Sequence, residues 1–377
     1  MIARKDLMSK FLRNFDNNED YLQKYIELLL LHDEGSAYSY NRPEKMRKLN
    51  IAITSTCNLN CVWCHRDQPE FKDTSYLQKE MPFELLKKLL PHSKGFKRIH
   101  LCGIGEPLTH SRISDAVKEA KKYVDEVLIT TNGTLLVKRH AEELAESGLT
   151  GLEVSIDGFD GETNYKFRGS KEDKIIEHLE YLSEISNIPI QINSILADAN
   201  YESLFGAVDK LKNVKNLKRL HVIPLFMQDR LREMNIGRVT DEQMKQLLDH
   251  YKDRIEALGL VNIDIYPDLA EAELDPIITL REKHNICYYP HREPFVNIYG
   301  HIAPCPFLEQ FSCGSVVERG IEDTWNGSEL LKWRSTQLAG HYCEVCQNYC
   351  NVKDKGEYDF ELLPGYNTKG VDPNNSD

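Results

Sequence analysis

The alternation of strand-like and helix-like segments between residue 48 and about residue 260 constrains the fold more than any other feature. Short apolar runs rich in β-branched residues lie at 49–56, 96–103, 126–133, 152–158, 188–196 and 217–226. Amphipathic segments with helical spacing lie between and after them, at 82–92, 112–124, 137–148, 171–185, 201–213 and 240–259. This order predicts a parallel sheet joined by right-handed crossovers. Because six units are too few to close an eight-fold barrel, we expect an α/β fold with a partial (βα)6 TIM-like barrel.

Outside this repeat the sequence changes character. Residues 1–47 combine the helical pattern YLQKYIELLLLH with a turn-rich stretch, so we expect an N-terminal helical arm and linker before a barrel at 48–260. Residues 261–362 contain six of the ten cysteines and short strand-like runs with a turn at Gly300. A bound metal would stabilise so small a C-terminal domain. Residues 363–377 are expected to form a disordered tail.

Charge and composition exclude some classes of function. The net charge of −12 and the pI of about 5.6 argue against a nucleic-acid-binding protein, because such proteins usually carry a basic surface. The N-terminus lacks a secretory signal, and the longest early apolar run, IELLLLH, is too short to cross a bilayer. We therefore expect a cytoplasmic protein without a membrane partner. Thiols stay reduced in the cytoplasm, so the cysteines predict metal centres rather than disulfides.

Three cysteines, Cys57, Cys61 and Cys64, follow the first strand-like run at CxxxCxxC spacing. This position places them at the carboxyl end of the sheet, where parallel α/β folds carry their active sites. A structural zinc site usually takes four ligands. Three thiolates can instead hold three irons of a [4Fe–4S] cluster and leave the fourth iron open to a small chelating ligand. The alternative is a zinc knuckle completed by His65.

This motif and its place after the first strand resemble the radical S-adenosylmethionine (radical SAM) superfamily. The resemblance implies that the methionyl end of SAM binds the open iron and that SAM cleavage yields a radical that abstracts a substrate hydrogen atom. Trp63 matches the aromatic residue that the family places before its third cysteine. CGIGEPL resembles the family's GGEP motif and supplies Gly103, Gly105 and Glu106, although Ile104 replaces the first glycine of the pair. Glu106 is expected to accept a hydrogen bond from the SAM ammonium group.

Further candidates for SAM binding lie at the carboxyl ends of the later strands. The resemblance, which covers about residues 48–230, points to Asn132, Ser155, Asp157, Arg168 and Asn193. A bidentate arginine such as Arg168 suits the carboxylate of SAM. For each of these residues the alternative is a turn or surface position without a ligand.

The late cysteines are similar in order to the SPASM and twitch extensions of radical SAM enzymes. Cys287 is followed by Gly300 and Cys305, and then by CEVCQNYC. The resemblance implies at least one auxiliary iron–sulfur cluster, expected to be [4Fe–4S]. Its predicted ligands are Cys287, Cys305, Cys343 and Cys346, with Cys350 as an alternative ligand. A set for two closed clusters is incomplete, and a zinc ribbon would suit the same spacing.

Two remaining cysteines are candidate hydrogen-atom donors. Cys102 lies beside the predicted SAM-binding turn, and Cys313 lies among the late cysteines. An epimerase needs a thiol that returns a hydrogen atom to the substrate radical, whereas a dehydrogenase does not. The alternative for both residues is packing, because buried cysteines usually behave as small apolar side chains.

Together these features predict a radical SAM oxidoreductase or epimerase that acts on a small polar metabolite such as a sugar or cyclitol. The first 47 residues contain no evident leader-peptide-binding domain, which favours a small molecule over a peptide. A peptide-modifying maturase of the RiPP type is the alternative within the family, and a non-enzymatic zinc scaffold is the alternative outside it. The family's usual reductant is a flavodoxin or a ferredoxin.

Overall fold

The computed structural model describes residues 48–67, 76–225, 229–258, 262–265, 287 and 289–350. The arm predicted at 1–47 and the tail predicted at 363–377 lie outside these residues, as does the far limit of the predicted domain at 261–362.

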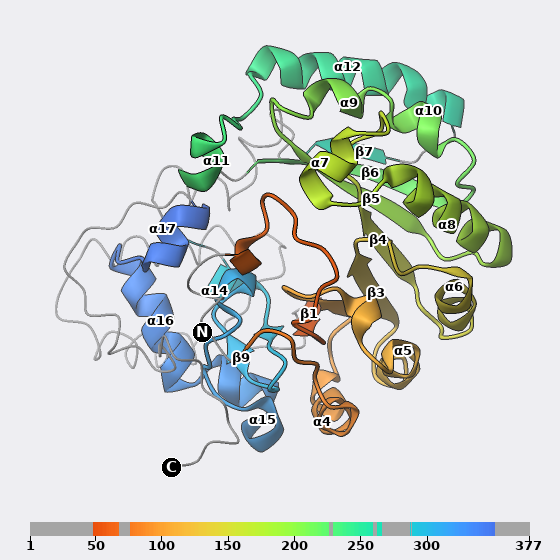
Figure 1. Cartoon of the computed structure of the whole chain (residues 1–377). Coiled ribbons are helices and arrows are strands. Elements are labelled where there is room, and N and C mark those ends of the chain that lie inside the picture. The colour runs from red at the N-terminus through yellow and green to blue at the C-terminus, as the bar shows by residue number, and fades with distance from the viewer. Residues whose placement is uncertain are drawn as a thin grey trace.

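All six predicted strands are present. They are β1 (Lys48–Ala52), β2 (Arg98–Cys102), β3 (Glu126–Thr131), β4 (Gly151–Ser155), β5 (Ile190–Leu196) and β6 (Leu217–Pro224). Each pairs in parallel with the next along the chain. The strands form a curved sheet with helices along its outer side (Figure 1). Within the described residues the sheet stays open, and the predicted α/β partial barrel is confirmed.

The predicted helices of the barrel are also present. They are α4 (Phe83–Leu89), α5 (Ile113–Ala120), α6 (Lys138–Ala145), α8 (Glu172–Ile185) and α12 (Asp241–Leu258). The segment predicted as one helix at 201–213 is instead two short helices, α9 (Tyr201–Leu204) and α10 (Ala207–Leu211). Gly206 separates them, and a Cβ atom there would lie 3.0 Å from the carbonyl oxygen of Phe159. Among the described helices, none has both the length and the apolar composition that a bilayer-spanning segment needs.

The sheet continues at both edges into the region that the sequence assigned to a separate domain. The run NIDIY forms β7 (Asn262–Ile265), which pairs in parallel with β6 as a seventh strand. At the other edge, β8 (Phe295–Val296) pairs in parallel with β1, and β9 (Ile302–Ala303) pairs antiparallel with β8. The predicted turn at Gly300 lies between β8 and β9 and has a φ of 76°, which favours glycine.

The two faces of the sheet differ in polarity. Residues that face the helices are apolar and fully buried, as Ile99, Leu101 and Val127 illustrate. Side chains alternate along a strand, and the intervening residues of β2 to β5 include His100, Thr130, Glu153 and Asn193, which bond to one another. The inner side of the barrel, which we call the lumen, is therefore polar.

Most of the described structure from residue 289 to residue 350 is helical, which the sequence analysis did not predict. Its helices are α14 (Tyr289–Arg292), α15 (Val316–Trp325), α16 (Ser328–Leu338) and α17 (Glu344–Cys350). Arg334 is fully buried among them. Its Nε donates to the Pro290 carbonyl oxygen at 2.6 Å and its Nη1 to that of Trp325 at 2.8 Å, while the guanidinium lies 4.3 Å from the Trp325 ring centroid. One arginine thus joins α14, α15 and α16.

A buried carboxylate connects this helical region to the barrel. Glu309 is fully buried, and its Oε1 accepts a hydrogen bond from the Ile104 N–H at 2.6 Å. Its Oε2 accepts a second hydrogen bond from the Tyr76 hydroxyl at 2.8 Å. Burial raises the pKa of Glu309 to about 8, against the opposing effect of these donors.

This raised pKa predicts a pH-dependent stability. The folded state holds the Glu309 proton more tightly than the unfolded chain, so its stabilising contribution is present below pH 4.5 and is lost as the pH rises towards 8. The free energy of unfolding should therefore fall between pH 6 and 8 by up to about 1.4 kcal/mol per pH unit. Glu309→Gln should flatten this slope in urea denaturation of the full chain. Parallel curves for wild type and variant would contradict the assignment.

Candidate metal centre and active site

The three cysteines of the CxxxCxxC motif lie together just beyond the end of β1. The Cys64 N–H bonds to the Cys61 carbonyl oxygen at 3.0 Å, which closes the loop into a turn. Burial raises the pKa of Cys61 to about 12; Arg168 lowers it, and the nearby Cys64 and Cys57 raise it further. The three thiols are therefore close enough to affect one another's ionisation.

The donor set fits a multi-iron cluster better than a single metal ion. Among the described residues, no three histidine, cysteine, aspartate or glutamate side chains surround a point where one ion would fit. In a cluster each thiolate binds a different iron, so the thiolates need not converge on one point. This arrangement does not favour the zinc knuckle that would use His65 as its fourth ligand.

Asp157 holds the second half of the cysteine loop in place. Its Oδ2 accepts hydrogen bonds from the Trp63 Nε1, at 3.0 Å, and from the Arg168 Nε. Its Oδ1 accepts from the Ile195 N–H at 2.7 Å. The Trp63 ring stacks on Phe167 with a centroid separation of 4.6 Å. Asp157 is completely buried, and its hydrogen bonds hold Trp63 and Arg168 in position beside the loop.

Arg168 lies between Asp157 and the thiols. Burial disfavours its charge, but Asp157 and the thiols of Cys61 and Cys64 raise its pKa above the usual value. A fixed cation beside the thiols favours the thiolate form that binds iron. Because one edge of the guanidinium is taken by Asp157, the predicted bidentate contact to SAM would have to use the other edge.

Glu106 holds the first half of the loop in the same way. Its backbone N–H bonds to the Thr56 carbonyl oxygen at 2.8 Å. Its carboxylate accepts from the Leu108 N–H at 3.0 Å, the Thr131 hydroxyl at 2.6 Å and the Asn132 N–H at 2.6 Å. Burial raises the pKa of Glu106 although these donors favour the anion. Three of about four acceptor positions are used, which leaves one for the predicted SAM ammonium group.

The glycines of CGIGEP allow the backbone to come close to the cysteine loop. A Cβ atom at Gly105 would lie 2.3 Å from the Thr54 carbonyl oxygen and 2.7 Å from that of Thr56. Gly103 has a φ of 121°, and a Cβ there would lie 2.9 Å from the Cβ of Ala52. Gly105 in particular is required by the close approach of this turn to residues 54–56.

Asn132 joins the end of β3 to the cysteine loop through a residue that the sequence analysis missed. Its Nδ2 donates to the Asn58 Oδ1 at 2.9 Å, and the Asn58 Nδ2 donates to the Thr134 hydroxyl at 2.8 Å. The sequence did contain a signal for Asn58, because this polar residue directly follows Cys57 in the motif CNLNC.

Three predicted residues face the lumen instead of the cysteine loop. Ser155 and Asn193 are register partners on β4 and β5. Cys102 ends β2, two residues after His100, and therefore shares the lumen face with it. Burial raises the pKa of Cys102 to about 12, so its thiol stays protonated at neutral pH. Asn193 bonds to Glu153, a lumen carboxylate that the sequence analysis did not single out.

Four late cysteines, Cys287, Cys305, Cys343 and Cys346, are all buried. The sulfur atoms of Cys343 and Cys346 are 3.5 Å apart at the start of α17. The hydrogen bond from Cys346, with backbone N–H groups of the same turn, lowers the pKa of Cys343. Cys305 precedes η5 (Pro306–Leu308), which packs against α17. Buried cysteines that include one adjacent pair fit an auxiliary cluster. Cys350 ends α17, and its side chain is not among those described.

Cys313 lies apart from the lumen. It is fully buried, its N–H donates to the Ile302 carbonyl oxygen at 2.7 Å, and burial raises its pKa. Its own carbonyl oxygen accepts from the Arg319 Nη2 at 3.3 Å. Of the two predicted hydrogen-atom donors, Cys102 is the one that the fold places on the lumen face.

The two cysteine regions contact each other directly. His65, next to Cys64, lies edge-on to Phe307 with ring centroids 5.0 Å apart. Phe307 is two residues after Cys305, so this ring contact joins the loop of the first three cysteines to the segment that follows Cys305.

Two family models match the chain. Residues 51–196 match the model described as the radical SAM superfamily, which covers β1 to β5 and the first three cysteines. Residues 287–351 match the SPASM model, an iron–sulfur cluster-binding domain, which covers the late cysteines.

Relatives of known name cover the chain to different extents. The tungsten-containing aldehyde ferredoxin oxidoreductase cofactor-modifying protein of Pyrococcus furiosus is 26% identical over 341 residues, or 83% of this chain and 89% of the relative. A probable GTP 3′,8-cyclase of Thermoplasma volcanium is 32% identical over 168 residues, or 44% of this chain and 49% of the cyclase. The match therefore spans about half the length of that cyclase.

Solved structures share the fold. Streptococcus suis SuiB bound to S-adenosylmethionine aligns with a TM-score of 0.62 and 20% identity, over 95% of this chain and 84% of SuiB. The protein anSMEcpe with bound AdoMet aligns with a TM-score of 0.61 and 16% identity, over 84% of this chain and 92% of anSMEcpe.

Asp157→Asn should destabilise the loop strongly, because it leaves Arg168 buried without its counter-charge. We expect a loss of about 3–5 kcal/mol in the free energy of unfolding, together with reduced iron incorporation, measured by urea denaturation and iron analysis. Asp160→Asn is the matched control. Asp160 lies in the segment after β4 that also contains Asp157, and its carboxylate is exposed and bonds to Thr163. It should cost no more than about 1 kcal/mol. Equal effects of the two changes would refute the special role of Asp157.

Gly105→Ala should prevent SAM binding, because the added methyl group collides with backbone that cannot move without displacing Cys57. Equilibrium dialysis of the reconstituted protein against radiolabelled SAM would measure this. Gly161→Ala is the control: it has a positive φ of 89° but no atom within 4 Å of the added Cβ. It should lower stability slightly and leave SAM binding intact; SAM binding by Gly105→Ala would show that the turn is less constrained than we infer.

Proposed function

We infer that this chain, which belongs to the radical SAM superfamily and carries a SPASM iron–sulfur domain, removes a hydrogen atom from a polar substrate held in the barrel lumen. When bound, the [4Fe–4S] cluster and SAM supply the radical chemistry. We assign Cys57, Cys61 and Cys64 to the cluster, and Glu106 and the outer edge of Arg168 to the ammonium and carboxylate of SAM. Asp157, Trp63 and Asn132 keep these groups in position.

The polarity of the lumen supports a small polar metabolite, such as a sugar or cyclitol, as the substrate. Asn50 and His100 are only 5% and 7% exposed, although both side chains are polar. Both face the lumen, as Glu153 does. The names of two relatives also refer to non-peptide molecules, the cofactor of an oxidoreductase in one case and GTP in the other. A peptide substrate is the second candidate, because a structure of SuiB contains its precursor peptide.

Two outcomes for the substrate radical have separate support. Epimerisation requires a hydrogen atom from a second donor, and the protonated thiol of Cys102 faces the lumen. Oxidation requires the radical to lose one electron and one proton. The late cysteines, in contact with the first cysteine loop through Phe307 and His65, suit an auxiliary cluster that accepts the electron. In either case a flavodoxin or ferredoxin is the reductant that we propose for the first cluster.

The three adjacent thiols at the mouth of a polar barrel carry this proposal. Anaerobically reconstituted wild-type protein should be brown, absorb near 400 nm, and release 5′-deoxyadenosine when SAM and dithionite are added. Cys57→Ala, Cys61→Ala and Cys64→Ala should each reduce the release at least 100-fold, since each removes one thiolate ligand. Wild-type protein without dithionite is the background control. A colourless zinc protein, or release that persists in all three variants, would overturn the proposal.

Cys102→Ser distinguishes the two outcomes. A hydroxyl is a far poorer hydrogen-atom donor than a thiol, so an epimerase should lose its product while still forming 5′-deoxyadenosine. An oxidase should keep its product yield. For epimerisation, reaction in D2O should also place one deuterium on the product through the exchangeable thiol. An epimerised product that the serine variant still makes would exclude Cys102 as the donor.

A further inference from the structure

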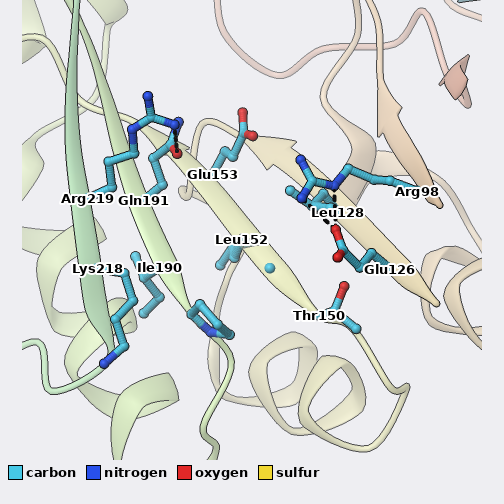
Figure 2. Close-up of a pocket in the computed structure, with 12 residues that line it drawn as sticks. Arg98, Glu126, Leu128, Thr150, Leu152, Glu153, Ile190, Gln191, Lys218 and Arg219 are labelled. Carbon is cyan, nitrogen blue, oxygen red and sulfur yellow. Dashed lines mark hydrogen bonds and ion pairs between the residues drawn. The ribbon is translucent and has the colours of Figure 1, made fainter. Parts of the chain in front are cut away.

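A cavity of about 410 Å³ lies on the lumen side near the amino ends of β2 to β6. Glu153 lies at its upper edge in Figure 2, between Arg219 and Gln191 on one side and Arg98 and Glu126 on the other. Unlike the cysteine mouth, this region is lined by residues from the middle and start of the strands. Of the β4 residues that line it, Glu153 is nearest the carboxyl end of the strand and thus lies on the side that faces the groups we assign to SAM.

Glu153 belongs to one layer of the lumen that also contains Cys102. In the sheet register Thr130 pairs with Glu153, Glu153 with Gln191, and Gln191 with Arg219. Leu101 pairs with Ile129, so Cys102 continues this row by one strand. Adjacent strands lie about 4.8 Å apart. A molecule held by Glu153 is then about two strands from the thiol that we propose as hydrogen-atom donor.

Hydrogen bonds converge on one oxygen of Glu153 from both sides. The Thr130 hydroxyl donates to Oε2 at 3.0 Å, and because its proton is used there, the His100 Nε2 at 2.6 Å from Thr130 must be the donor in that contact. On the other side the Gln191 Nε2 donates to the Asn193 Oδ1 at 2.7 Å, and the Asn193 Nδ2 donates to Oε2 at 3.1 Å. Both series of hydrogen bonds end at the Glu153 carboxylate and orient it.

This arrangement keeps Glu153 ionised and leaves its second oxygen available. Burial raises the pKa of Glu153, but His100, Lys48 and the two hydrogen bonds more than reverse this and leave it below the usual value. Burial also lowers the pKa of His100 to about 4, so the ring is neutral at pH 7. Both protein hydrogen bonds reach Oε2, and no described residue bonds to Oε1. Oε1 is thus a fixed acceptor at the cavity wall.

We propose that Glu153 anchors a polyhydroxylated substrate in the lumen, on the side of this cavity that faces the SAM groups, by accepting a hydrogen bond from one of its hydroxyl groups. The inference rests on the proposed function and names its substrate class. Hydroxyl groups both donate and accept, and so do the neighbouring Thr130, Asn193 and Gln191 side chains. An ammonium group only donates, so it could not accept from these side chains, and the nearby Arg219 would repel it. Thr130, Asn193 and His100 act as positioning residues for the anchor.

The cavity contains a second carboxylate that serves as a matched control. Glu126 is bound by Arg98, through Nε at 2.7 Å and Nη2 at 2.5 Å, and by the Lys97 Nζ at 2.8 Å. These three contacts occupy the oxygens of Glu126. They lower its pKa, and the opposing rise caused by burial is smaller. It lines the same cavity without offering the free acceptor that Glu153 has.

The test is binding of myo-inositol and D-glucose to the reconstituted full-length protein, measured by saturation-transfer NMR and calorimetry. Glu153→Gln keeps the shape of the side chain and should weaken polyol binding about 10-fold or more. Thr130→Val removes one hydrogen bond to the Glu153 carboxylate and should weaken polyol binding by a smaller factor. Glu126→Gln should leave polyol binding within twofold of wild type. Circular dichroism checks that each variant is folded.

Equal polyol binding by wild type and Glu153→Gln would overturn the proposal. So would the finding that neither polyol binds the wild type, or that cyclohexylamine binds at Glu153 in place of both. Release of 5′-deoxyadenosine by the wild type separates the two levels of inference. If the wild type does not release it, the proposed function fails, while the binding comparison still decides the role of Glu153.

Discussion

Two buried carboxylates, Glu106 and Asp157, hold the cysteine loop, and the geometry of the whole site depends on them. A buried carboxylate costs free energy unless donors surround it. Glu106 receives donors from Leu108, Thr131 and Asn132, and Asp157 receives donors from Trp63, Arg168 and Ile195. Each carboxylate therefore fixes the end of a strand relative to the loop. Three thiols on an irregular segment can then keep a constant arrangement without regular secondary structure.

The fold separates two environments along every strand. Apolar residues on the outer face pack against helices and stabilise the barrel, while their neighbours in sequence form a polar lumen. The cost of burying those polar groups is offset because they bond to one another across neighbouring strands, as Thr130, Glu153 and Asn193 do. The same network gives the lumen a defined acceptor, so the interior is arranged for a polar molecule before one binds.

The sequence predicts the strands of the barrel and the residues at their carboxyl ends, because alternation and motif spacing are local properties. It does not predict what those residues bond to. Asp157 was expected at SAM and instead bonds to Trp63 and Arg168, a relation that only folding reveals. Glu153 and Glu309 were missed because neither belongs to a motif; their partners are distant in sequence. The helices α15 and α17 were missed because Gly320, with a φ of 81°, interrupts α15 and because α17 has only seven residues.

Contacts through Glu309 and through His65 and Phe307 connect the barrel to the SPASM region that carries the late cysteines. The central claim is that the first group leaves an iron open to SAM. Electron paramagnetic resonance of the dithionite-reduced protein, recorded with and without SAM, tests it most directly. The account predicts that SAM changes the signal in wild type and that this change is absent in Cys57→Ala. An identical spectrum with and without SAM, in protein shown to contain iron, would contradict it.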